Sequence, residues 1–104
     1  MALPNEKIKA FRGIGHNLKP VVTISENGIT EGVQLELERA LNDHELIKVK
    51  VSCGDREQKQ ALIQELLTSC NCELVQTIGK IALIYRAATK PNQKLSNVAR
   101  FYQR

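Results

Sequence analysis

The chain has 104 residues, of which 42% are hydrophobic and only 4% aromatic, and its formal net charge is +4. This length fits one domain with a single aliphatic core, and the hydrophobic content excludes a wholly disordered chain. Two phenylalanines and two tyrosines are too few for an RNA-binding sheet that stacks several bases on aromatic rings, unless nearly all of them converge.

Charge is unevenly distributed along the sequence. Residues 1–24 carry four basic and one acidic side chain, residues 25–79 carry five basic and ten acidic, and residues 80–104 carry six basic and none acidic. If folding brings the two basic ends together, they form a surface that attracts a polyanion. The alternative is that the basic C-terminal tail is only a solvated extension.

The three cysteines, together with the lack of an apolar leader or long apolar run, predict a cytoplasmic protein without a membrane span. Cys70-x-Cys72 does not have zinc-ligand spacing, so we expect free thiols and no metal. The spacing of His16, His44, Cys53 and Cys70 does not support a nucleophile and its base. We therefore expect no catalytic residues, no cofactor and no small-molecule substrate.

A short helix is predicted over residues 5–17, because apolar residues recur there at helical spacing. Its apolar stripe consists of Ile8, Phe11 and either Ile14 or Gly15. Pro20 disfavours helical backbone at the residue before it, so the helix should end earlier. The pair Gly13-x-Gly15 lacks a preceding strand and a third glycine, which favours close packing against a sheet over a dinucleotide loop.

The β-branched run at residues 21–24 predicts a buried strand, and the Asn-Gly pair at 27–28 predicts a sharp turn after it. Thr30 is the expected N-cap of a second helix over residues 30–43. Unpaired backbone N–H groups at such a helix start can bind phosphate, although ordinary strand–helix connections share the pattern. Gly32 costs the helix about 1 kcal/mol, which suggests close approach of a backbone or ligand.

Residues 44–51 predict a second strand, with Lys48 and Lys50 on one face and Ile47, Val49 and Val51 on the other. The two lysines form either a positive ridge for a ligand or simply the solvated face of the sheet. Their role therefore depends on what lies beside them in the fold.

Asp55 is the expected N-cap of a third helix, whose apolar stripe holds Leu62, Ile63, Leu66 and Leu67. Strands at 74–78 and 81–85 follow, joined as a hairpin by Gly79-Lys80. Residues 87–104 read as a flexible basic tail that can dock through Val98, Phe101 and Tyr102. The order α-β-α-β-α-β-β predicts an α/β, two-layer sandwich with parallel crossovers and one antiparallel hairpin.

With these elements in order, the chain resembles a CRM domain, the chloroplast RNA splicing and ribosome maturation module. It is most similar to the stand-alone bacterial members of the YhbY type. The matching segments, which follow the family's order, are residues 15–22 (GHNLKPVV), 27–33 (NGITEGV), 44–50 (HELIKVK), 75–80 (VQTIGK) and 83–86 (LIYR). The resemblance covers residues 5–86, so a CRM-like RNA-binding domain is expected at 1–86, followed by the basic tail at 87–104.

The resemblance implies a four-stranded mixed sheet similar to the C-terminal domain of translation initiation factor three. It also implies RNA binding, since bacterial members associate with precursors of the large ribosomal subunit and plant members serve intron splicing. The family's G-x-x-G loop falls on residues 25–28, where Ser25 replaces the first glycine and Glu26 adds an acid. Ser25 can still donate through its hydroxyl and Asn27 through its amide.

We therefore expect a monomeric, cytoplasmic RNA-binding protein that associates with ribosomal RNA in large-subunit precursors. Because aromatic residues are scarce, recognition should depend on RNA shape or on a splayed loop. The expected RNA-binding residues are Lys9, Arg12, His16, Asn17, Lys19, Ser25, Asn27, Gly28, Thr30, Lys48, Lys50, Lys80 and Arg86. The alternative is a protein-interaction module that docks on a ribosomal protein or assembly factor through the acidic second helix.

Overall fold

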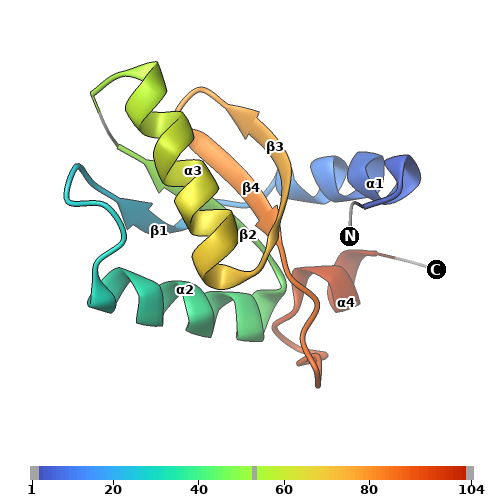
Figure 1. Ribbon diagram of the computed structural model, residues 1–104. Coiled ribbons are helices and arrows are strands. Elements are labelled where there is room, and N and C mark those ends of the chain that lie inside the picture. The colour runs from blue at the N-terminus through green and yellow to red at the C-terminus, as the bar shows by residue number, and fades with distance from the viewer. Residues whose placement is uncertain (1–2, 53, 103–104) are drawn as a thin grey trace.

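The computed structural model describes residues 3–52 and 54–102 (Figure 1). Cys53, one of the three predicted free thiols, lies outside the described residues. The elements in chain order are α1 (Asn5–Gly15), β1 (Pro20–Ile24), α2 (Glu31–His44), β2 (Leu46–Val51), α3 (Arg56–Cys70), β3 (Glu73–Ile78), β4 (Ile81–Tyr85) and α4 (Asn97–Phe101).

The four strands form one mixed sheet in the order β1-β2-β4-β3. β1 runs parallel to β2, whereas β4 is antiparallel to both of its neighbours. The predicted α/β class, element order and four-stranded mixed sheet are thus confirmed. A short final helix, α4, follows the last strand and extends the predicted order to α-β-α-β-α-β-β-α.

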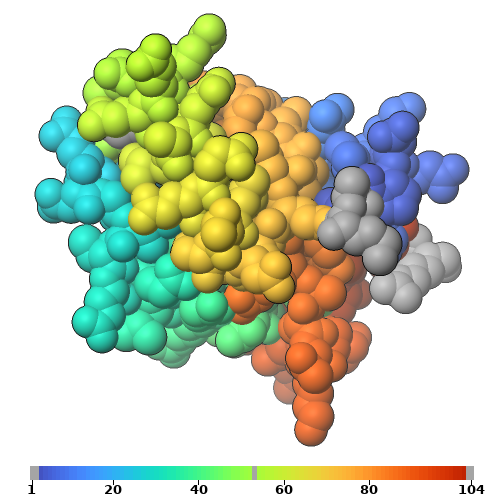
Figure 2. Space-filling view, in the orientation of Figure 1, coloured from blue at the N-terminus to red at the C-terminus, as the bar shows by residue number. Residues whose placement is uncertain are grey.

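Helices α2 and α3 cover one face of the sheet, as Figures 1 and 2 show, and together with the sheet they form the two main layers. Ile47, Val49 and Val51 point into this main core and are almost completely buried. Their neighbours on β2 point the other way, as the alternation in sequence predicted. Lys48 is half-buried and Lys50 is exposed on that second face.

Helices α1 and α4 pack against only one end of the second face, where they form a smaller core around Phe11, Leu46 and Leu83 (Figure 1). The ring centroid of Phe11 lies 4.7 Å from that of Tyr85 and 5.4 Å from that of Tyr102. Three of the four aromatic residues therefore stabilise the contact between the N-terminal helix and the C-terminal segment. The two basic ends of the chain meet at this end of the molecule.

The segment after residue 86, expected to be a flexible tail, is held by buried contacts. Glu45 adopts the positive φ of 61° between α2 and β2, and its carboxylate accepts hydrogen bonds from the Ser96 hydroxyl at 2.6 Å and the Ala88 N–H at 2.9 Å. Val98 and Tyr102 join the smaller core as predicted. Phe101 does not, because 49% of its surface is exposed and the Arg100 guanidinium lies 4.7 Å from its ring centroid.

The two glycines of α1 have different surroundings. A Cβ added to Gly15 would lie 2.5 Å from a methyl carbon of Leu83, so the predicted close packing against the sheet is confirmed there. For Gly13 that explanation is wrong, because an added Cβ would meet no atom of the described residues within 4 Å. Gly32 in α2 has the same open surroundings, so no protein backbone of the described part explains it.

Candidate nucleic-acid interface

The part of the second sheet face that α1 and α4 leave uncovered carries basic side chains. Lys48 is paired with Leu83 across β2 and β4, and Lys50 is paired with Ile81. Paired residues point to the same side of a sheet, so the two lysines stand beside an apolar strip. We call this uncovered surface, with the end of α1 that borders it, the open face.

The C-terminal end of α1 borders the open face and creates a hollow of about 250 Å³. The hollow is lined by Arg12, Gly15, His16, Lys48, Gln76, Ile78, Ile81 and Leu83. The missing side chain of Gly15 lets α1 approach Leu83 closely, which brings Arg12 and His16 to the edge of the sheet. Two predicted basic residues and one histidine are therefore gathered around one concave site.

The predicted phosphate loop between β1 and α2 lies at the opposite end of the sheet from α1 and α4 (Figure 1). Residues 25–28 form a tight turn in which the N–H of Gly28, with φ of 76°, donates to the Ser25 carbonyl at 2.9 Å. The Ser25 hydroxyl accepts the Asn27 N–H at 3.4 Å, so these two amides are used within the turn. Ser25 and Asn27 are exposed.

Thr30 caps α2 as predicted, because its hydroxyl accepts the Val33 N–H at 3.2 Å. The N–H groups of Glu31 and Gly32 precede the first intrahelical donor, the Gln34 N–H, so they have no acceptor within the helix and point out of its start. Glu31 and Gly32 are both exposed, which leaves room for an anion at this position. Glu26 in the same loop is exposed and opposes such binding by its charge.

The β3–β4 turn lies at the same end of the sheet as this loop. The Val51 N–H donates to the Lys80 carbonyl, and the Ser52 N–H donates to the Ile24 carbonyl, both at 2.7 Å. The Lys59 ammonium of α3 donates to the Gly79 carbonyl. Since β1 and β2 end here, beside the β3–β4 turn, the exposed Lys80 stands at the end of the open face that is far from α1.

The predicted site residues thus fall into separate places. Arg12, His16 and Lys48 line the hollow; Lys50 and Lys80 continue the open face toward the loops. The loop residues Ser25, Asn27, Gly28 and Thr30 lie beyond that far end. Lys9 and Lys19 are exposed, and Asn17 lines a different hollow beside Phe101.

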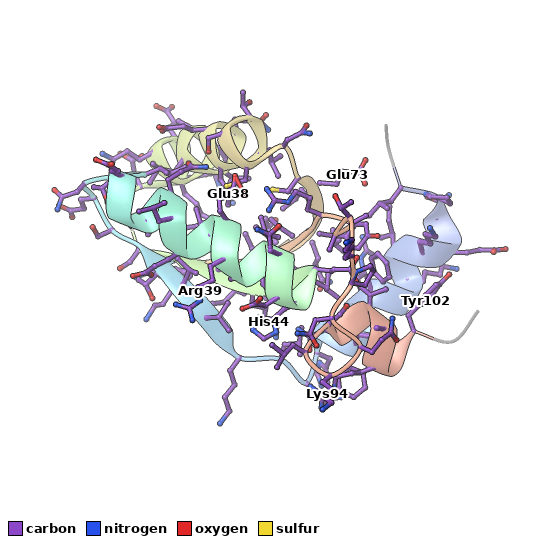
Figure 3. All side chains as sticks on the ribbon, turned by 90° about the horizontal axis from the view of Figure 1, so that it is seen from below. Glu38, Arg39, His44, Glu73, Lys94 and Tyr102 are labelled. Atoms are coloured by element: carbon purple, nitrogen blue, oxygen red, sulfur yellow. The ribbon has the colours of Figure 1, made fainter. Side chains whose placement is uncertain are left out.

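Arg86, one of the expected RNA-binding residues, lies away from the open face. Its guanidinium pairs with the Glu38 carboxylate and donates to the Asn42 side chain at 3.0 Å and the Cys70 carbonyl at 2.9 Å. Glu38 lies between α2 and α3 in Figure 3, and only 20% of the Arg86 side chain is exposed. Arg86 therefore connects the two helices of the main core.

The hollow also includes residues that were not predicted: Gln76, Ile78, Ile81 and Leu83. The alternation of the hairpin strands could have placed Ile81 and Leu83 beside the lysines. Gln76 could not be placed in this way, because the register between β3 and β4 shifts between Leu74 and Gln76. A bulge of this kind leaves little signal in sequence periodicity.

Within residues 3–52 and 54–102, the acidic residues, cysteines and histidines do not form a group of three that could hold a metal ion. Cys70 and Cys72 are buried free thiols. Burial raises the pKa of Cys70, and burial with the nearby Cys70 raises the pKa of Cys72 to about 12. Of the helices described here, none is both long and apolar enough to cross a bilayer.

The four-stranded mixed sheet is the one that the resemblance to CRM domains implied. The chain belongs to the CRS1/YhbY (CRM) domain family, whose sequence model it matches over residues 3–86. A probable RNA-binding protein of Pseudomonas aeruginosa is 57% identical over 101 residues, which cover 97% of each chain. An RNA-binding protein of Haemophilus influenzae is 46% identical over 96 residues, which cover 91% of this chain and 97% of the relative.

A solved structure shows the same fold. The solution structure of a hypothetical protein from Staphylococcus aureus, described as a candidate RNA-binding protein, aligns with a TM-score of 0.75 at 30% identity. The alignment covers 91% of this chain and 98% of the other. The relatives' names thus describe RNA-binding proteins.

Proposed function

We propose that this protein binds RNA through its open face without catalysing a reaction. The proposal is carried by the separation of charge between the two faces of the sheet. Arg12, Lys48 and Lys50 stand on or beside the open face, whereas α2 on the other face holds four acidic residues against one arginine, and α3 holds two acidic and two basic residues. A polyanion is attracted to the first face and repelled by the acidic α2 on the second.

The proposed target is ribosomal RNA within precursors of the large ribosomal subunit, bound by a monomer in the cytoplasm. Membership of the CRM family and the similarity to its YhbY-type members support this choice. One RNA backbone would run along the sheet. It would contact the end of α1, then Lys48 and Lys50, and then the loop between β1 and α2. Contacts to phosphates position the RNA, and contacts to bases provide any sequence preference.

Filter binding to a transcript of the precursor large-subunit RNA at rising salt tests the proposal. Each phosphate contact contributes about 0.7 to 0.9 to the slope of log affinity against log salt. We expect a steep slope for the wild type and a slope smaller by about this amount for Lys48→Ala and for Lys50→Ala. Arg39→Ala, on the exposed side of α2, is the matched control and should leave the slope unchanged. A flat response of the wild type would contradict the proposal.

A second candidate function is docking of a protein partner on α2. Leu35 is 66% exposed on this helix and is flanked by the exposed Glu31 and Glu36. An exposed large apolar residue with acidic neighbours suits a basic, partly apolar protein surface. Glu36→Lys would abolish association with ribosomal particles but preserve RNA affinity if this function holds. Glu38 is unsuitable for that test, because its carboxylate is paired with Arg86.

A further inference from the structure

We infer that the hollow at the α1 end of the open face receives one unpaired nucleotide base of the RNA. This inference rests on the proposed function and names its substrate class, which is RNA with a bulged or looped-out nucleotide. Three features of the hollow carry it: its size, the contrast between its floor and its rim, and the position of the aromatic residues elsewhere in the fold.

The size of the hollow suits a single base. Pockets for drug-sized molecules enclose about 300 to 1,000 Å³, so a volume of about 250 Å³ fits a smaller flat group. The floor comes from Leu83, which is buried, and from the half-buried Ile81, its neighbour but one on β4. This apolar floor lies on β4, between β2 and β3. It favours a group that is planar and weakly solvated on its faces.

The rim supplies the polar groups that a base and its phosphate require. Gln76 offers an amide with both donors and an acceptor, which matches the mixed edges of nucleobases. Arg12 offers a planar guanidinium and His16 an imidazole ring, and both can stack on an unpaired base. Lys48 lies at the same rim as a point charge for the adjoining phosphate.

The aromatic residues explain why one base, and not a row of bases, is expected. Phe11, Tyr85 and Tyr102 pack on one another in the smaller core, where they cannot form a stacking platform on the sheet. Ile78, at the edge of the hollow, is 65% exposed and is the cross-strand neighbour of Ile81. It extends the apolar surface by about one side chain, which suits the sugar of the captured nucleotide.

Two hairpin RNAs with the same stem provide the test. In one the stem is fully paired, and in the other it carries a single bulged 2-aminopurine; a dye on the loop reports binding by fluorescence polarisation. We expect the wild type to bind the bulged hairpin about tenfold more tightly, the scale of one base-stacking contact. The fluorescence of 2-aminopurine should change with the same midpoint as the polarisation.

Two variants locate the base. Ile81→Ala removes part of the apolar floor and Gln76→Ala removes the amide at its rim, and each should reduce the preference for the bulged hairpin to about twofold or less. Gln60→Ala, an exposed glutamine on α3, is the matched control and should leave both affinities unchanged. If Ile81→Ala fails to fold by circular dichroism, Gln76→Ala decides, because that side chain is only half-buried.

Salt-dependent binding of both hairpins with equal affinity and no change in 2-aminopurine fluorescence would overturn the inference and leave the proposed function intact. A tenfold preference that both variants retain would place the base elsewhere and would also overturn it. Failure of the wild type to bind either hairpin or the ribosomal transcript would contradict the proposed function, and the inference would fall with it.

Discussion

The hydroxyl of Ser96 donates a 2.6 Å hydrogen bond to the carboxylate of Glu45, and both residues are buried. Ser96 also caps α4 by accepting the Ala99 N–H at 3.1 Å, while the Asn97 side chain donates to the Leu46 carbonyl at 2.7 Å. One carboxylate at the junction of α2 and β2 thereby fixes the start of the last helix. The basic C-terminal segment is positioned beside α1 by these contacts.

Replacing Ser96 should therefore destabilise the protein. Ser96→Ala removes the helix cap and one donor to a buried carboxylate, and we expect a loss of about 2–3 kcal/mol in the free energy of unfolding. Urea unfolding followed by circular dichroism measures this loss. Ser69→Ala, at an exposed position of α3, should change stability by less than about 0.5 kcal/mol. Equal stability of the two variants would show that the Glu45 contact does not hold the segment.

Arg86 should matter for stability and not for RNA binding. Arg86→Ala removes hydrogen bonds to the Asn42 side chain and the Cys70 carbonyl and leaves Glu38 unpaired, so we expect a loss of about 1–2 kcal/mol. Arg86→Lys keeps the charge but not the planar fork, and should recover less than half of this loss. The salt dependence of RNA binding should be unchanged in both variants. A smaller salt slope for Arg86→Ala would place this side chain in the RNA interface.

The two glycines of α1 should respond to alanine with opposite signs. Gly13→Ala adds a Cβ into open space and should stabilise the protein by about 0.5–1 kcal/mol through helix propensity. Gly15→Ala places its Cβ against the buried Leu83 and should cost about 1–2 kcal/mol, since the overpacking exceeds the gain in propensity. Thermal or urea unfolding of both variants measures the signs. Stabilisation by Gly15→Ala would show that α1 does not press on the sheet.

Cys72 should make the fold sensitive to alkali. Its pKa is raised by burial to about 12 from an ordinary value of 9.0, so the thiol stays protonated in the folded state while it ionises in the unfolded chain. Stability is then fully retained below about pH 9 and decreases between about pH 9 and pH 12. We expect unfolding free energies to fall from about pH 9 to about pH 10.5, and to fall less in Cys72→Ala. An identical decrease in both proteins would contradict the buried, neutral thiol.

Much of the fold could be predicted from sequence because its signals are local. The Thr30 and Asp55 caps and the alternation of Val49 with Lys50 depend on neighbours along the chain. The role of Arg86 depends on Glu38 and Cys70, which meet only when α2 packs beside α3. The sequence shows that Arg86 carries a positive charge, but it does not show which residues the guanidinium contacts.

The candidate site could be predicted only in part for the same reason. Lys48 was placed on the correct face by strand alternation, and Arg12 was identified by its charge. The hollow between them requires the register shift in β3 and the approach of Gly15 to Leu83, and neither leaves a periodic pattern. The order of the C-terminal segment depends on Glu45, an acid whose burial no local pattern predicts.

Titration of isotope-labelled protein with the precursor ribosomal transcript, or with a fragment that binds in the filter assay, tests the proposed interface most directly. Chemical shifts of backbone amides report which side of the sheet the RNA covers. We expect the largest changes at Arg12, His16, Lys48, Lys50 and Lys80. Changes confined to the outer side of α2, around Leu35 and Glu36, with the open face unaffected, would contradict it.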